Sequence, residues 1–189
     1  MENALVSKLL RTKENTTALN ILIVVAGAVS LSILAQVSIP LPFTPVPITG
    51  QTFGVSLMAL LFGARRAMAT VWLYLLAGAV GLPVFSLGRS GLFWGPTIGY
   101  LGGMLLASYV VGFLADRGWA NTFTRGYLAA SVGSAITFIF GLSVLSFFVP
   151  SNQLLAAGLY PFLLGDFLKN SLAAAIARAA NSISSGSDC

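Results

Sequence analysis

The sequence predicts an all-α integral membrane protein with six transmembrane helices and both termini in the cytoplasm. Of its 189 residues, 57% are hydrophobic and only 8% are charged, whereas soluble domains are about 25% charged. Residues 15–64 and 126–165 contain no Asp, Glu, Lys or Arg. We therefore expect a six-helix membrane domain over 18–181, between an N-terminal arm at 1–17 and a flexible C-terminal tail at 182–189.

The first predicted helix, 18–39, is long enough to span a bilayer and too long for the apolar core of a signal peptide. A proline-rich loop at 40–51 leads into a shorter helix at 48–63, which Arg65 and Arg66 end. The remaining helices are expected at 67–82, 96–115 and 127–148, and the sixth contains 161–177.

The distribution of basic residues predicts the orientation in the bilayer. Cytoplasmic loops carry an excess of Lys and Arg. With six helices, eight of the ten basic residues fall on the side of the two termini: Lys8, Arg11, Lys13, Arg65, Arg66, Arg117, Arg125 and Arg178. The opposite side has only Arg89. The net charge of +5 therefore reflects loops at a membrane surface, and we expect no nucleic-acid partner.

Several classes of site are not expected. The chain has no His, and its one Cys is Cys189, so neither a metal site nor a disulfide framework is predicted. It also lacks a GxxxxGK[ST] phosphate loop and an evident nucleophile–base pair. We expect neither an enzyme nor a cofactor, and any ATP-driven activity would need partner chains.

Asp166 and Lys169 are unusual because they lie in a predicted membrane helix whose segment 161–177 is otherwise uncharged. An ionisable group at membrane depth costs about 2.5–3.5 kcal/mol on insertion scales. Residues three apart share a helix face, so both side chains can reach one cavity. An ion pair that joins helices is one interpretation, and a ligand or transport site is the favoured one.

Arg89 lies in an outer loop that could fold over this pair. The three side chains together carry one net positive charge, which suits a ligand with one carboxylate, since Arg and Lys can both donate to it. Asp166 would then accept from a ligand N–H or orient Lys169, and both options remain open. Other expected contacts are Thr49, Gln51, Tyr74, Phe85 and Tyr100, with Pro42, Phe43 and Thr44 in a lid whose prolines limit its flexibility.

Four motifs occur in one order along the chain: PFTPVPITGQTFGV at 42–55, YLLAGAVGLPVF at 74–85, GPTIGYLGG at 95–103 and PFLLGDFLKN at 161–170. Together they resemble the BioY family, the biotin-binding S components of energy-coupling factor (ECF) transporters. The D-x-x-K motif of the family falls on Asp166 and Lys169, and its basic loop residue falls on Arg89.

The resemblance implies a substrate-capture subunit of an ATP-driven vitamin importer in the prokaryotic plasma membrane, binding biotin from the outer face. It also implies a transmembrane T component and two ABC-type ATPase subunits as partners, docked on small residues of the first helix that include Ala28 and Ser32. Two alternatives remain: a solitary secondary carrier of biotin or another small carboxylate, and a structural or assembly membrane protein.

Overall fold

The computed structural model describes residue 5 and residues 16–91 and 95–186. Most of the N-terminal arm predicted at 1–17, including its three basic residues, and residues 187–189 lie outside this range, whereas Thr16 and Thr17 belong to α2. The described elements are α2 (Thr16–Gln36), β1 (Ser38–Ile39), β2 (Ile48–Thr49), α3 (Gln51–Phe62), α4 (Ala64–Ala79), η1 (Ser86–Gly88), α5 (Ile98–Asp116), η2 (Trp119–Asn121), α6 (Phe123–Leu145), α7 (Leu154–Gly158) and α8 (Tyr160–Gly186).

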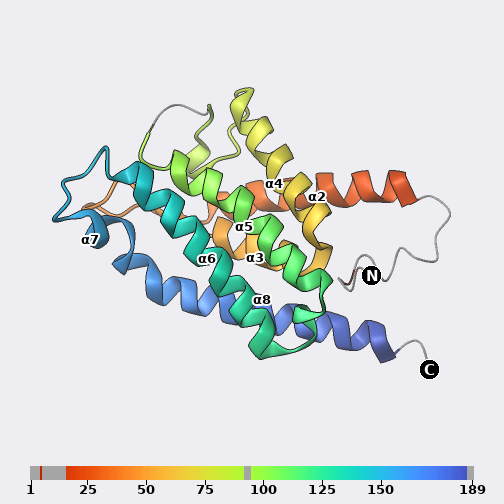
Figure 1. Cartoon of the computed structure of the whole chain (residues 1–189). Coiled ribbons are helices and arrows are strands. Elements are labelled where there is room, and N and C mark those ends of the chain that lie inside the picture. The colour runs from red at the N-terminus through yellow and green to blue at the C-terminus, as the bar shows by residue number, and fades with distance from the viewer. Residues whose placement is uncertain (1–4, 6–15, 92–94, 187–189) are drawn as a thin grey trace.

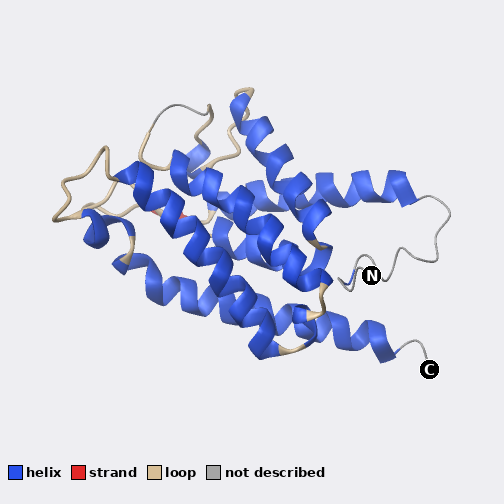
Figure 2. Cartoon of the chain, in the orientation of Figure 1, coloured by secondary structure: helices blue, strands red, loops and turns tan. Residues whose placement is uncertain are grey.

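The long helices alternate in direction along the bundle (Figure 1). The connections that follow α2, α4 and α6 gather at one end, and the longer loops of the molecule are found there (Figure 2). The α3–α4 and α5–α6 junctions lie at the opposite end, together with both termini (Figure 1). Both termini lie at one end, as an even number of spanning helices requires.

The first two predicted helices extend too far into the proline-rich segment. Ser38 pairs with Thr49 and Ile39 with Ile48 in a small antiparallel ladder. A residue before proline is pushed towards extended backbone, and proline itself supplies no N–H to a helix. Ile39 precedes Pro40, so the helix ends at Gln36 and the next one begins only at Gln51.

The break between α3 and α4 also lies elsewhere than predicted. Gly63 has a φ of 80° and a ψ of 175° and separates the two helices. Arg65 and Arg66 therefore belong to the first turn of α4 and do not end α3. The N–H of Ala64 donates to Oδ2 of Asp116 at 2.9 Å, so a side chain from the end of α5 caps α4.

The last helix continues past the boundary expected at residue 182, since α8 extends to Gly186. Among the described residues, three helical segments are long and apolar enough to cross a membrane: Thr17–Gln36, Ile98–Asp116 and Phe123–Leu145. By contrast, α3 has 12 residues and is about 18 Å long at 1.5 Å per residue, shorter than a hydrocarbon core of about 30 Å.

The interior differs between the two ends of the bundle. At the end of the termini, fully buried alanines from α3, α5, α6 and α8 let the helices approach closely: Ala59, Ala115, Ala129, Ala173 and Ala177. At the loop end, the core contains larger side chains, among them Tyr74, Phe85 and Tyr100. A cavity lined by Phe85 and Tyr100 lies there.

Candidate ligand-binding site

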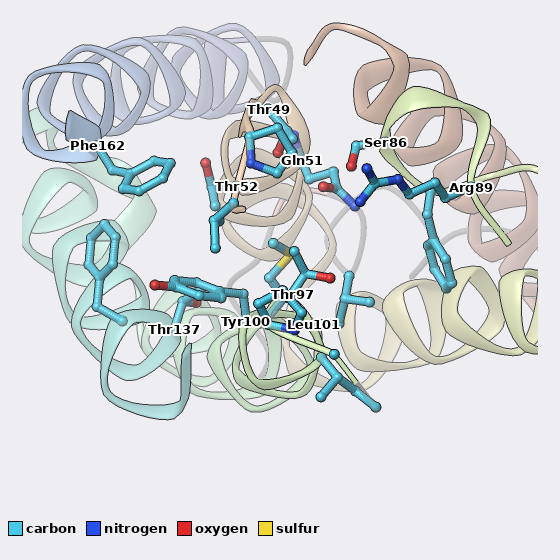
Figure 3. A pocket seen from close by; sticks show the side chains of 18 of the residues that line it. Thr49, Gln51, Thr52, Ser86, Arg89, Thr97, Tyr100, Leu101, Thr137 and Phe162 are labelled. Carbon is cyan, nitrogen blue, oxygen red and sulfur yellow. The ribbon is translucent and has the colours of Figure 1, made fainter. Parts of the chain in front are cut away.

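A pocket of about 240 Å³ is enclosed by α3, α5, α6, α8 and the loops before α3 and α5 (Figure 3). It brings together seven of the eight predicted ligand contacts: Thr49, Gln51, Phe85, Arg89, Tyr100, Asp166 and Lys169. Residues separated by more than 100 positions in the chain therefore share one cavity. No cluster of metal-ligating His, Cys, Asp or Glu side chains occurs within the described residues.

Asp166 is held by hydrogen bonds from neutral side chains. Its Oδ1 accepts from the Ser134 hydroxyl of α6 at 2.8 Å, and its Oδ2 accepts from Nδ2 of Asn170 at 3.0 Å. Nδ2 of Asn170 also donates to Oγ of Ser134 at 2.9 Å. The carboxylate is thus oriented by two helices at the wall of the pocket.

Lys169 is bonded to a different element. Its Nζ donates to the backbone oxygen of Thr49 at 2.6 Å and to Oγ1 of Thr52 at 3.3 Å. Throughout the described part of the chain, no ion pair within 4.0 Å joins Lys169 to Asp166. The structure therefore shows no direct contact through which Asp166 would orient Lys169 or join helices, and the role of Asp166 stays a prediction. The two groups present one acceptor and one donor to the pocket.

Arg89 reaches the pocket from the loop between α4 and α5 and points towards its centre (Figure 3). The loop is shaped by Leu87, which has a left-handed φ of 62°. It is also bound to the end of α2, because Nε2 of Gln36 donates to the oxygen of Phe85 at 3.1 Å and Oε1 of Gln36 accepts from N–H of Gly88 at 3.0 Å. Arg89 and Phe162 of α8 lie on opposite sides of the cavity (Figure 3).

Tyr74 does not line the pocket, although the sequence suggested that it would. It is 1% exposed and supports two residues that do line the cavity. Its hydroxyl accepts from Nε2 of Gln51, and its ring meets Phe85 edge to face with centroids 5.4 Å apart. Phe85 in turn packs against Gly78, where a Cβ atom would lie 2.1 Å from the ring.

The predicted lid is present as a loop, but Pro42, Phe43 and Thr44 do not line the cavity; Val46 and Pro47 do. Phe43 is 63% exposed. Thr44 is buried, and its hydroxyl donates to the backbone oxygen of Ala157 in α7 at 2.7 Å. The loop is thus anchored on α7.

Tyr100 supports the same region from α5. Its hydroxyl donates to the backbone oxygen of Gly158 at 2.8 Å, while its ring lies against Gly141, where a Cβ atom would be 2.3 Å away. The short helix α7 is therefore held by two buried hydroxyls, one from the loop and one from a long helix.

Several pocket residues were not found from the sequence. These are mainly neutral side chains of α3, α5, α6 and α8: Thr52, Met104, Thr137, Phe138 and Phe162. Only Phe162 carried a usable signal, because it lies four residues before Asp166 and hence on the same helix face. The others are ordinary residues of apolar helices.

The small residues assigned to partner docking occupy different positions. Ala28 is 7% exposed and belongs to the internal core, so it offers no surface to another chain in this structure. The Ser32 hydroxyl donates to the backbone oxygen of Ala28 at 2.8 Å. Ala26 and Ser30, the neighbouring small pair, are exposed.

Comparison with known proteins identifies relatives over most of the chain. The model of the BioY family matches residues 7–185. A protein of Thermotoga maritima named biotin transporter BioY is 38% identical over 156 residues, covering 80% of this chain and 90% of the relative. A protein of Rhizobium etli with the same name is 37% identical over 162 residues, covering 80% and 85%.

A solved structure has the same fold. It is the S-component for biotin from an ECF-type ABC transporter, and it superposes with a TM-score of 0.82 at 26% identity, covering 90% of this chain and 95% of that one. Family match, sequence identity and fold agree over most of the chain. This chain belongs to the BioY family.

Proposed function

We propose that this chain is the biotin-binding S component of an ATP-driven vitamin importer. The observation that carries the proposal is the pocket itself, in which Asp166 and Lys169 face the cavity as an acceptor and a donor that are not paired with each other. The names of the relatives in Thermotoga maritima and Rhizobium etli and of the structural neighbour support biotin as the ligand.

The chemistry of biotin matches the distribution of groups around the pocket. Its ureido ring offers N–H donors and a carbonyl acceptor, its bicycle is apolar, and its valeryl chain ends in a carboxylate. A ligand N–H can donate to Asp166, and Lys169 can donate to the ureido carbonyl. Phe85, Tyr100 and Phe162 provide apolar walls.

We assign the ligand carboxylate to Arg89, on the side of the pocket opposite Phe162 and α8 (Figure 3). A carboxylate placed at Lys169 would lie beside the like charge of Asp166, which is unfavourable. Joint binding of the carboxylate by Arg89 and Lys169, as charge placement alone suggested, is the competing assignment, and the two can be separated by ligand chemistry.

The test is calorimetric titration of the purified chain in detergent with biotin and with biotin amide, which lacks the carboxylate charge. Arg89→Gln should weaken biotin binding about 10- to 100-fold, the range for a charge-assisted hydrogen bond, and leave amide binding unchanged. Lys169→Met should weaken both ligands alike. Arg178→Gln, a change at an exposed arginine far from the pocket, is the matched control.

If the effect of Lys169→Met disappears with biotin amide, the carboxylate belongs to Lys169. If the wild-type chain binds neither biotin nor other vitamins in direct titrations, the importer function is wrong and a structural or assembly role remains.

As partners we propose a transmembrane T component and two ABC-type ATPases, with the chain spanning the prokaryotic plasma membrane several times. Biotin uptake should then cease in cells that lack the coupling subunits. Continued uptake in those cells would favour the alternative of a solitary secondary carrier.

The exposed pair Ala26 and Ser30 is the better docking surface on α2. Ala26→Trp should block coupled uptake without changing biotin affinity, because close helix approach needs small side chains. Ala28→Trp should instead destabilise the chain, since Ala28 is buried in its own core.

A further inference from the structure

We propose that Ser134 and Asn170 are positioning residues, which hold the Asp166 carboxylate as a hydrogen-bond acceptor and so make the pocket select ligands with an N–H group at this point. The inference rests on the proposed function, because it assigns the residues behind the recognition of the ureido ring. Neither residue lines the pocket.

The direction of each hydrogen bond follows from the donors available. An amide nitrogen carries two hydrogens, and Nδ2 of Asn170 uses them on Ser134 Oγ at 2.9 Å and on Asp166 Oδ2 at 3.0 Å. Ser134 therefore accepts through its oxygen and directs its single hydroxyl hydrogen to Asp166 Oδ1, at 2.8 Å. Both carboxylate oxygens receive hydrogens, and neither faces an acceptor in this network.

Ser134 and Asn170 are buried, so only Asp166 in this network can contact the ligand. Asn170 is 2% exposed and Ser134 is 9% exposed, and the two side chains stand behind Asp166 on α8 and α6. Each carboxylate oxygen accepts one internal hydrogen bond and has a second lone pair. The free lone pairs can accept from a ligand N–H but can give nothing to a ligand acceptor.

The network also keeps Asp166 apart from Lys169, whose ammonium is bound to Thr49 and Thr52 of the neighbouring segment. The acid and the amine share a helix face but have separate anchors. Without Ser134 and Asn170, the carboxylate is free to turn towards the nearby ammonium. Its lone pairs would then be satisfied internally, and the site would lose its acceptor.

The experiment compares biotin with its two analogues methylated at one ureido nitrogen. The analogue whose lost N–H faced Asp166 will bind the wild type more weakly than biotin does. The dissociation constant of this analogue divided by that of biotin measures N–H selection. Ser134→Ala and Asn170→Ala should each reduce this ratio by about tenfold, the value of one hydrogen bond to a charged group. Ser134→Thr, which retains the hydroxyl, should restore it.

Matched controls are Ser131→Ala on α6, where the hydroxyl only bonds back to Tyr127 at 2.9 Å, and Asn181→Ala, a buried asparagine farther along α8. Both should leave the ratio unchanged. In an Asp166→Asn background, Ser134→Ala should have no further effect on the ratio, because its action passes through Asp166.

A purely structural role would lower the melting temperature and weaken biotin and both analogues by one common factor, with the ratio preserved; that result would overturn the proposal. A ratio that still falls in the Asp166→Asn background would also overturn it. These outcomes differ from a failure of the proposed function, in which the wild-type chain does not bind biotin.

Discussion

At the scale of single residues, the proposed binding site depends on keeping two opposite charges apart. Asp166 and Lys169 could satisfy each other on one helix face, yet each is held by neutral groups from a different segment. A direct ion pair would neutralise both groups and leave little for a ligand. The separate anchors preserve one acceptor and one donor, which is the arrangement that a cyclic urea requires.

A first prediction concerns the role of Lys169 outside ligand binding. In the ligand-free chain, Lys169→Met removes the hydrogen bond to the Thr49 carbonyl, so hydrogen exchange at the start of α3 should accelerate. The free energy of unfolding should fall by less than the about 3–5 kcal/mol expected for breaking a buried ion pair, because Asp166 keeps Ser134 and Asn170. A loss within that range would show that the two charges do stabilise each other.

A second prediction concerns Gly78, where a side chain would collide with the ring of Phe85. Gly78→Ala should displace Phe85 from the pocket wall and weaken biotin binding several-fold, since overpacking typically costs about 1–3 kcal/mol. Gly102→Ala is the control, because a Cβ atom there meets nothing within 4 Å. Equal affinities in the two variants would contradict a role for the Phe85 position.

At the scale of elements, the end of α2 positions the loop that carries Arg89. Gln36 is the last residue of α2 and bonds that loop through both its amide nitrogen and its amide oxygen. An exposed arginine in a free loop would lose much conformational entropy on binding. Fixing the loop before the ligand arrives lowers this cost.

The third prediction follows from this contact. Gln36→Leu should weaken biotin binding several-fold although Gln36 does not line the pocket. The effects of Gln36→Leu and Arg89→Gln should not add in the double variant, because the first acts through the second. Independent, additive losses in calorimetric titrations would exclude a positioning role for Gln36.

The loop at 40–49 is the second element on which the pocket depends. It contributes Val46 and Pro47 to the pocket and is anchored to α7 through Thr44. As a fourth prediction, amide exchange in this loop should slow when biotin is added, and Thr44→Val should remove the protection while the helices remain protected. Identical exchange with and without biotin would count against closure of a lid.

At the scale of the whole molecule, the two ends of the bundle differ in structure. Alanines pack the helices closely at the end that holds the termini, while aromatic residues and loops enclose the pocket at the other. Most described basic residues belong to the α3–α4 and α5–α6 junctions at the first end, and Arg89 belongs to the α4–α5 loop at the second. The pocket should therefore open to the outer side, with the termini in the cytoplasm.

The fifth prediction tests this orientation. In a Cys189→Ser background, single cysteines are introduced by Ser151→Cys in the loop before α7 and by Ser182→Cys near the end of α8, both at exposed positions. A membrane-impermeant thiol reagent applied to intact cells should label the first and spare the second. The reverse pattern would invert the topology.

The sequence alone is sufficient for the membrane class, the order of the six helices and the presence of Asp166 and Lys169 at the pocket. Uncharged stretches and rare charges at membrane depth are strong local signals, because the cost of burying charge in hydrocarbon is large. Arg89, expected in an outer loop that folds over this pair, also lines the pocket, and the four motifs indicate the BioY family.

Tertiary structure decided which faces of these helices meet. In a helix that is apolar on all sides, such as α2, periodicity does not distinguish the buried face, so the sequence assigns Ala28 to the surface although it is in the core. Tyr74 is predicted in the pocket and instead supports its wall, because the sequence shows that an aromatic side chain is available but not what it packs against. Ser134, Asn170 and Gln36 are common residues whose importance comes from partners far away in the chain, and only packing brings them together.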